Sequence, residues 1–119
     1  MTALLVVAGA VLGAPLRLLA ERVAVARRGS GSVLGTLSVN VAGSAVLGLL
    51  LGLATAPAWL VALVGTGFCG TLTTFSTFGV EVVRLVEERT AGRAAGYAAV
   101  TLLLGLGAAS VGWLLGRGI

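Results

Sequence analysis

The residues best suited to chemistry lie in the third apolar stretch of the chain, where glycine, threonine and phenylalanine are interleaved. Its glycines and hydroxyl residues are Gly65, Gly67, Gly70, Thr71, Thr73, Thr74, Ser76 and Thr77. Glycine and β-branched residues both lower helix propensity, so a helix through this stretch is predicted to break. A break would free backbone carbonyls, whose oxygens are hard ligands suited to an alkali cation. The alternative is a continuous helix whose hydroxyls bond to their own backbone.

Three phenylalanines and one asparagine indicate a second possible ligand, a small anion. The phenylalanines are Phe68, Phe75 and Phe78. An aromatic ring has a positive edge, so rings turned edge-on to a pore could contact an anion weakly. Asn40 lies inside an apolar segment, one turn after Thr36, and its amide could supply a hydrogen-bond donor. The alternatives are simple packing for the rings and an interhelical hydrogen bond for Asn40.

The composition excludes several classes of protein. The chain has no histidine and a single cysteine, so it can build neither a histidine-based triad nor a typical transition-metal site, and no enzyme is expected. Eight arginines and four glutamates give a net charge of +4, but the arginines stand at segment ends, which disfavours nucleic acid as a partner. Charged residues make up only 10% of the chain, and its mean hydropathy is +1.12, so its apolar surface is expected to face lipid.

Four apolar segments are long enough to cross a bilayer, and they would hold these residues within it. We predict spans over about 3–22, 33–54, 58–89 and 93–116, within a single transmembrane domain covering 1–119. The predicted fold class is an all-α membrane protein with four transmembrane helices, the third broken mid-membrane. The N-terminus lacks the charged start of a cleaved signal peptide, so the first segment is expected to be retained.

Small residues recur at every fourth position in the second and fourth segments. These residues are Ser44, Gly48, Gly52, Ala108, Gly112 and Gly116. Such rows let helix backbones approach closely in lipid. They predict a tight helix bundle or an oligomer.

Three stretches resemble motifs of the Fluc (CrcB) fluoride channels. Gly67–Phe78, with the sequence GFCGTLTTFSTF, resembles the family signature. Thr36–Ser44 resembles the second-span motif, and Gly13–Arg17 resembles the first-span motif. The spacing fits over essentially the whole chain, although Ala8 stands where the family commonly has glycine.

The resemblance implies an antiparallel, dual-topology-type dimer in the cell inner (plasma) membrane, enclosing two narrow pores. The implied function is passive export of cytoplasmic fluoride, which lowers its toxicity. The residues implied to line the fluoride path are Asn40, Phe75, Phe78, Thr36, Thr77, Tyr97 and Thr101. The backbone carbonyls of Gly70 and Thr73 are implied to bind a structural Na+ at the dimer centre, and no organic cofactor is implied. Glu81 is implied near a pore end and Arg17 near a vestibule.

The arginines are unevenly divided between the two sides of the predicted bundle. Those expected on one side are Arg22, Arg27, Arg28, Arg84, Arg89 and Arg93, against Arg117 alone on the other. The positive-inside rule then places both termini outside the cytoplasm. A homodimer inserted both ways should show little bias, so we hypothesise a preferred orientation and a related antiparallel partner of opposite bias. A homodimer that tolerates the bias is the alternative.

Two other functions stay open on the sequence alone. A small coupled transporter needs a carboxylate well inside a span, and only Glu21 and Glu81 come near that requirement. A non-transporting membrane subunit or assembly factor would be compatible with the small-residue rows.

Overall fold

The computed structural model describes residues 2–29, 33–73 and 76–118, which form a bundle of apolar helices measuring 48 × 28 × 22 Å. Within these residues, four helical stretches are long and apolar enough to cross a membrane: Thr2–Arg28, Leu34–Gly52, Ala58–Glu87 and Ala91–Gly118. The prediction of an all-α protein with four membrane spans is thereby confirmed.

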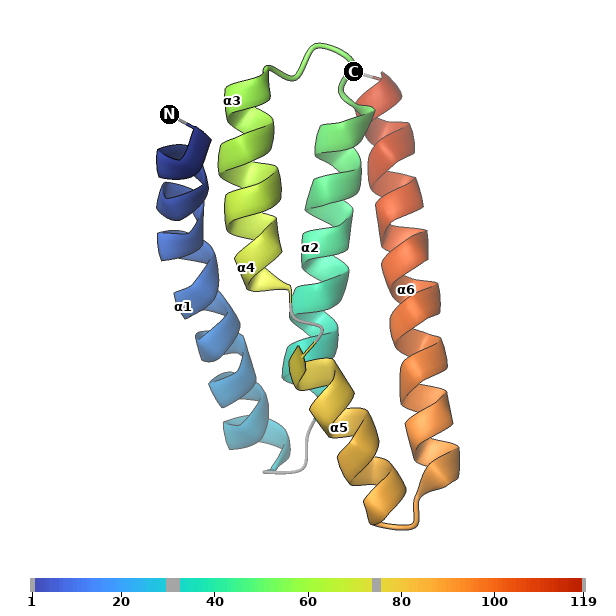
Figure 1. Ribbon diagram of the computed structural model, residues 1–119. Coiled ribbons are helices and arrows are strands. Elements are labelled where there is room, and N and C mark those ends of the chain that lie inside the picture. Colours follow the sequence, from blue (N-terminus) through green and yellow to red (C-terminus); the bar gives the residue numbers. More distant parts are fainter. Residues whose placement is uncertain (1, 30–32, 74–75, 119) are drawn as a thin grey trace.

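The helices alternate in direction along the bundle (Figure 1). Helix α1 (Thr2–Arg28) runs down in this view, α2 (Leu34–Gly52) runs up, the third stretch runs down, and α6 (Ala91–Gly118) runs up. The α2–α3 connection lies at the same end of the bundle as the two termini, and the α5–α6 turn lies at the opposite end. The first and third stretches are therefore parallel, as are α2 and α6.

Helix α1 continues further than the predicted first span. It includes the basic stretch 21–28 and ends at Arg28, just before Gly29, whose φ of +98° is favourable only for glycine. The N–H of Gly29 still bonds to the carbonyl of Val25 at 2.9 Å, which closes the last turn. Arg27 and Arg28 stand in that turn, where positive charge complements the helix dipole.

The small-residue rows pack α2 against α6 inside one chain. A Cβ added to Gly48 would overlap the carbonyl oxygen of Ala109, and one added to Gly112 would overlap that of Ala45. Contact between these two helices is the most extensive in the molecule. The rows thus act within the bundle, because only glycine lets the two backbones come this close.

The third stretch changes its helical form along its length. It consists of α3 (Ala58–Leu60), the π-helix η1 (Val61–Cys69), α4 (Gly70–Leu72) and α5 (Ser76–Glu87). Long π-helices are rare and tend to occur at functional sites. Thr73, directly after α4, is extended, with φ −76° and ψ 156°. Residues 74 and 75, within the stretch where the break is predicted, lie outside the described residues, so the break itself stays a prediction.

Two threonine hydroxyls of this stretch bond to the preceding backbone turn. Thr71 Oγ1 donates to the carbonyl of Gly67 at 2.7 Å, and Thr73 Oγ1 donates to that of Cys69 at 2.8 Å. This is the local bonding that the sequence offered as an alternative, and it occurs here next to the end of α4.

Candidate functional site

A buried carboxylate joins three helices in the half of the bundle that contains α5. Thr36 of α2 donates a hydrogen bond to Glu81 Oε1 at 2.5 Å, and Tyr97 of α6 donates one to Glu81 Oε2 at 3.1 Å. The exposed fractions of Thr36, Glu81 and Tyr97 are 2%, 9% and 7%. We call these three residues the Glu81 cluster.

The Glu81 cluster meets the physical requirement for a carboxylate inside a membrane bundle. A buried charge is costly unless donors compensate for the lost water, and intramembrane ionisable residues tend to be functional. Here each carboxylate oxygen accepts one hydroxyl proton. The two hydroxyls are oriented by the carboxylate, so a second anion could reach these donors only in competition with Glu81.

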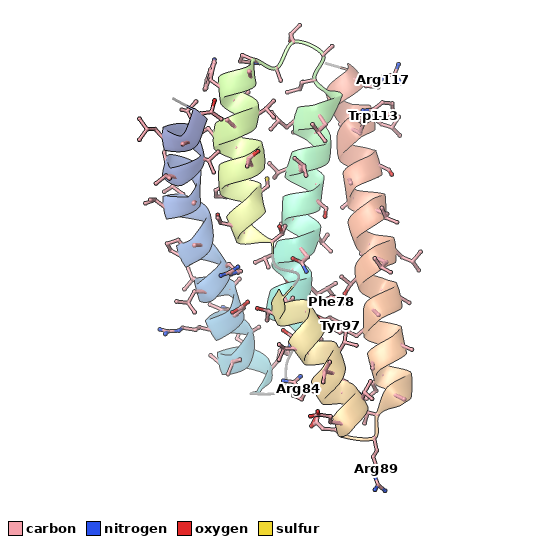
Figure 2. The ribbon with its side chains drawn as sticks, viewed as in Figure 1. Phe78, Arg84, Arg89, Tyr97, Trp113 and Arg117 are labelled. Carbon is pink, nitrogen blue, oxygen red and sulfur yellow. The ribbon has the colours of Figure 1, made fainter. Side chains whose placement is uncertain are left out.

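An aromatic contact extends the Glu81 cluster toward the middle of the chain's third stretch. The rings of Phe78 and Tyr97 have centroids 5.2 Å apart and are tilted by 52°. Figure 2 shows the two side chains together where α5 faces α6. Phe78 also packs against a small buried core that contains Leu85 and Ala94. The tilted geometry brings the positive edge of one ring toward the face of the other.

Each of the three helices carries another polar residue four positions from its member of the Glu81 cluster. This second residue lies closer to the middle of the bundle along the helix axis. These half-buried residues are Asn40 on α2, Thr77 on α5 and Thr101 on α6. Four residues correspond to about 6 Å along a helix and return to the same face. The buried Oγ1 atom of Thr101 has no hydrogen-bond partner within the described part of the chain. Its hydroxyl is thus a donor available to a ligand.

The remaining predicted site residues lie elsewhere. Arg17 is half-buried on α1, which packs against α2, η1 and α4. Gly70 is exposed and Thr73 is half-buried at the end of α4. Phe75 lies outside the described residues.

The described side chains form no cluster of the usual metal-binding kind. They contain no group of three or more His, Cys, Asp or Glu residues. A cation would therefore depend on backbone oxygens, and α4 offers a suitable end. The last four carbonyls of a helix lack helical partners. The carbonyl of Cys69, just before α4, is already satisfied, because it accepts both the N–H and the hydroxyl of Thr73, at 3.0 and 2.8 Å. The carbonyl of Gly70 is the next along the chain.

A cavity of about 650 Å³ opens beside Tyr97 at the arginine-rich end of the bundle. Arg28, Arg84 and Arg93 contribute to its lining, together with Glu88. From the sequence these arginines were assigned only to membrane topology. Their clustering around one cavity could not be found there, because it depends on how α1, α2, α5 and α6 are rotated against each other.

Comparisons with known proteins agree on one family. The family model described as "CrcB-like protein, Camphor Resistance (CrcB)" matches residues 4–113. A protein of Nocardia farcinica named "Fluoride-specific ion channel FluC 1" is 52% identical over 104 residues, which cover 87% of this chain and 72% of that protein. Proteins of the same name from Frankia casuarinae and Streptomyces avermitilis are 45% and 46% identical. Their alignments cover 98% and 92% of this chain, and 96% and 90% of the relatives.

Proposed function

This chain belongs to the CrcB family, and we propose that it is a fluoride-selective channel which lets fluoride leave the cytoplasm passively and so lowers its toxicity. Support comes from relatives at 45–52% identity that are named fluoride-specific ion channels. Because these relatives are channels, the chain is not regarded as an enzyme. It is a multi-pass membrane protein, and the cell membrane is the proposed location.

The observation that carries the proposal is the run of hydrogen-bond donors beside the Glu81 cluster. Fluoride is small and strongly hydrated, so a path for it must replace water with donors. Hydroxyl and amide groups supply such donors without the fixed positive charge that would trap the ion. The proposed path is lined by Asn40, Phe75, Phe78, Thr36, Thr77, Tyr97 and Thr101. In it, the hydroxyl of Thr101 is a donor that no group of the described residues uses.

We propose that two chains form an antiparallel dimer with two pores. The single chain leaves many large apolar side chains exposed along α1 and α6, so part of this surface is free for a partner and part for lipid. The partner is a second copy or a related chain of opposite orientation. The arginine bias favours a related chain, since a chain that inserts both ways should have balanced ends.

We further propose that a structural Na+ binds the backbone carbonyls of Gly70 and Thr73 at the dimer centre. Support comes from the end of α4 at Leu72 and from the extended conformation of Thr73, because carbonyls at a helix end lack helical partners. Gly70 is exposed on the bundle surface, where a second chain could approach it. The ion would supply positive charge at the interface and hold two carbonyl-bearing segments together.

A coupled transporter is the second candidate, because Glu81 is a buried carboxylate in the bundle interior. Such a residue could exchange a proton for a substrate. The channel is favoured, since both carboxylate oxygens already accept a hydrogen bond within the chain and the relatives at 45–52% identity are named channels.

Fluoride efflux from liposomes separates the two candidates. A channel releases fluoride without a proton gradient, whereas a coupled transporter requires the gradient and saturates at low turnover. The substitutions Asn40→Asp and Phe75→Ile test a third possibility, a protein that does not transport fluoride. If neither substitution changes fluoride release, a pore through these residues is wrong, and a non-transporting role becomes the better explanation.

A further inference from the structure

A groove of about 470 Å³ lies between α1 and α2 at the arginine-rich end, where α1 forms one edge of the bundle (Figure 1). Its α1 wall is apolar, and Leu16, Leu19 and Val23 in this wall are 45%, 56% and 42% exposed. From Leu16 to Arg27, the wall is about 16 Å long at 1.5 Å per residue. One leaflet of a bilayer contains about 15 Å of hydrocarbon, so the groove has the length of a lipid chain.

The close contact of α1 with α2 at Gly35 forms the floor of this groove. A Cβ added to Gly35 would lie 2.7 Å from the Cα of Glu21 and 3.0 Å from the carbonyl oxygen of Ala20. Gly35 and Ala20 line the groove, whereas the side chain of Glu21 does not. Among the described residues, the lining therefore contains no carboxylate that would repel an anion.

Two arginines close the groove at its outer end. Arg27 and Arg28 stand in the last turn of α1, both are exposed, and both line the groove. Within the described part of the chain, neither guanidinium takes part in an ion pair. Because the forked N–H donors of arginine match the oxygens of phosphate, two adjacent guanidinium groups at a membrane surface are suited to a phosphate group.

A second copy of this chain in the proposed antiparallel dimer would bring no negative side chain to these arginines. The acidic residues of the chain are Glu21, Glu81, Glu87 and Glu88, and all lie in the same half of the bundle as Arg27. An antiparallel copy presents its opposite half here, and that half contains no Asp or Glu. The complementary charge must then come from another source, and the membrane itself supplies phosphate at this depth.

We propose that the groove binds an anionic phospholipid of the cytoplasmic leaflet, with its phosphate on Arg27 and Arg28. One acyl chain lies along the leucine and valine wall of α1 and covers apolar surface of both helices. Basic pockets between transmembrane helices on the cytoplasmic side commonly bind such head groups, and the positive-inside rule assigns this end to the cytoplasm. The inference depends on that orientation and not on fluoride conduction.

Lipid titration of the purified chain in detergent, followed by native mass spectrometry, tests the head-group site. Phosphatidylglycerol should bind more tightly than phosphatidylcholine, whose phosphate is compensated by choline. Arg27→Gln should weaken phosphatidylglycerol binding by about fivefold, and Arg27→Gln with Arg28→Gln by about 25-fold. Arg22→Gln is the matched control, because it removes the same charge from α1 at a residue that does not line the groove.

A second pair of variants tests the acyl chain. Val23→Trp fills the groove without a change in charge and should weaken binding, whereas Leu18→Trp, at an exposed residue outside the lining, should not. Glycerol phosphate, which has no acyl chain, should not compete.

Equal binding of the two lipids, equal losses in Arg22→Gln and Arg27→Gln, or competition by glycerol phosphate would overturn the lipid site. Loss of the dimer in Val23→Trp with lipid binding unchanged would overturn it too and assign the groove to a subunit interface. Neither result bears on fluoride efflux, so the proposed channel is tested separately.

Discussion

Tyr97 donates a hydrogen bond to Glu81 across the contact between α6 and α5, with 3.1 Å between its hydroxyl oxygen and Oε2. Thr36 donates to the other oxygen of the same carboxylate, so one side chain ties α5 to both α2 and α6. Among the described helices, α5 makes extensive contact only with α6. The carboxylate is therefore important for the position of α5, and with it of Phe78.

The donor from Thr36 should contribute measurably to stability. Thr36→Val keeps the shape and removes the O–H, so a buried carboxylate loses one of its two donors. The expected loss is about 1–3 kcal/mol in the free energy of unfolding. Denaturant or thermal unfolding in detergent measures it, and Thr36→Ser, which keeps the hydroxyl, is the control. Equal stability of the valine variant and the unmodified protein would show that the hydrogen bond is unimportant.

Thr101 should behave in the opposite way, with an effect on conduction and little on folding. Its buried hydroxyl has no partner among the described residues, so Thr101→Val removes an unsatisfied polar atom. Stability should be unchanged or slightly higher. Fluoride efflux should fall by about tenfold, because a donor to the ion is worth about 1.4 kcal/mol or more. A variant that conducts like the unmodified chain would remove Thr101 from the path.

The contact between α2 and α6 should tolerate no added methyl group. Gly112→Ala places a Cβ against the carbonyl of Ala45, and the strain should cost about 1–3 kcal/mol. Gly107→Ala is the matched control on the same helix, because a Cβ there meets nothing within 4 Å. Thermal unfolding of the two variants should differ clearly. If both unfold like the parent, the close approach of the two helices is wrong.

The chain should insert in one preferred orientation. Arg84 and Arg89 lie at one end of the bundle, whereas Trp113 stacks with Arg117 at the other, 4.7 Å from the ring centroid to the guanidinium carbon (Figure 2). Arginine favours the cytoplasmic side, and tryptophan anchors a membrane interface.

Cysteine labelling in intact cells tests this orientation. Gly92→Cys, in open space at the arginine end, should be protected from an impermeant reagent, and Thr55→Cys at the opposite end should react. Native Cys69 is only 2% exposed and should contribute no background. Equal labelling at both positions would indicate insertion in both orientations, and with it a homodimer.

Sodium should stabilise the dimer if the carbonyls of Gly70 and Thr73 hold it. Thorough replacement of sodium by a large organic cation should lower the dimer fraction in detergent and the efflux rate in liposomes. Lithium and potassium, as alkali cations of other sizes, test whether the site is selective. No change in either measurement under complete exchange would argue against an ion at this place.

The sequence could predict the apolar spans and the small-residue rows of α2 and α6, because both depend on local patterns. Hydropathy identified four apolar segments, and the four-residue spacing of Gly48 and Gly112 indicated close helix contact. Helix α1 continues beyond the predicted first span, since charged residues near a membrane surface continue a helix as readily as apolar ones do. Arg27 and Arg28 still belong to α1.

The Glu81 cluster could not be assembled from the sequence. Thr36 and Glu81 are 45 positions apart, and their contact depends on the rotation of two helices about their axes. The π-helix before α4 adds to the difficulty, because i→i+5 bonding shifts the face on which later residues lie. For the same reason, Glu81 was placed only near a pore end, and its two hydroxyl donors were not anticipated.

The most direct test of the central claim is fluoride-electrode efflux from liposomes that contain this chain alone, with valinomycin to balance charge. The proposed function predicts rapid fluoride release without a proton gradient and little release of chloride, from this chain alone if it forms a homodimer and otherwise once a related partner chain is added. The same preparation shows whether one kind of chain is sufficient for the pore. Fluoride release that requires a proton gradient, or no release from vesicles into which a related partner chain has also been reconstituted, would contradict a passive fluoride channel.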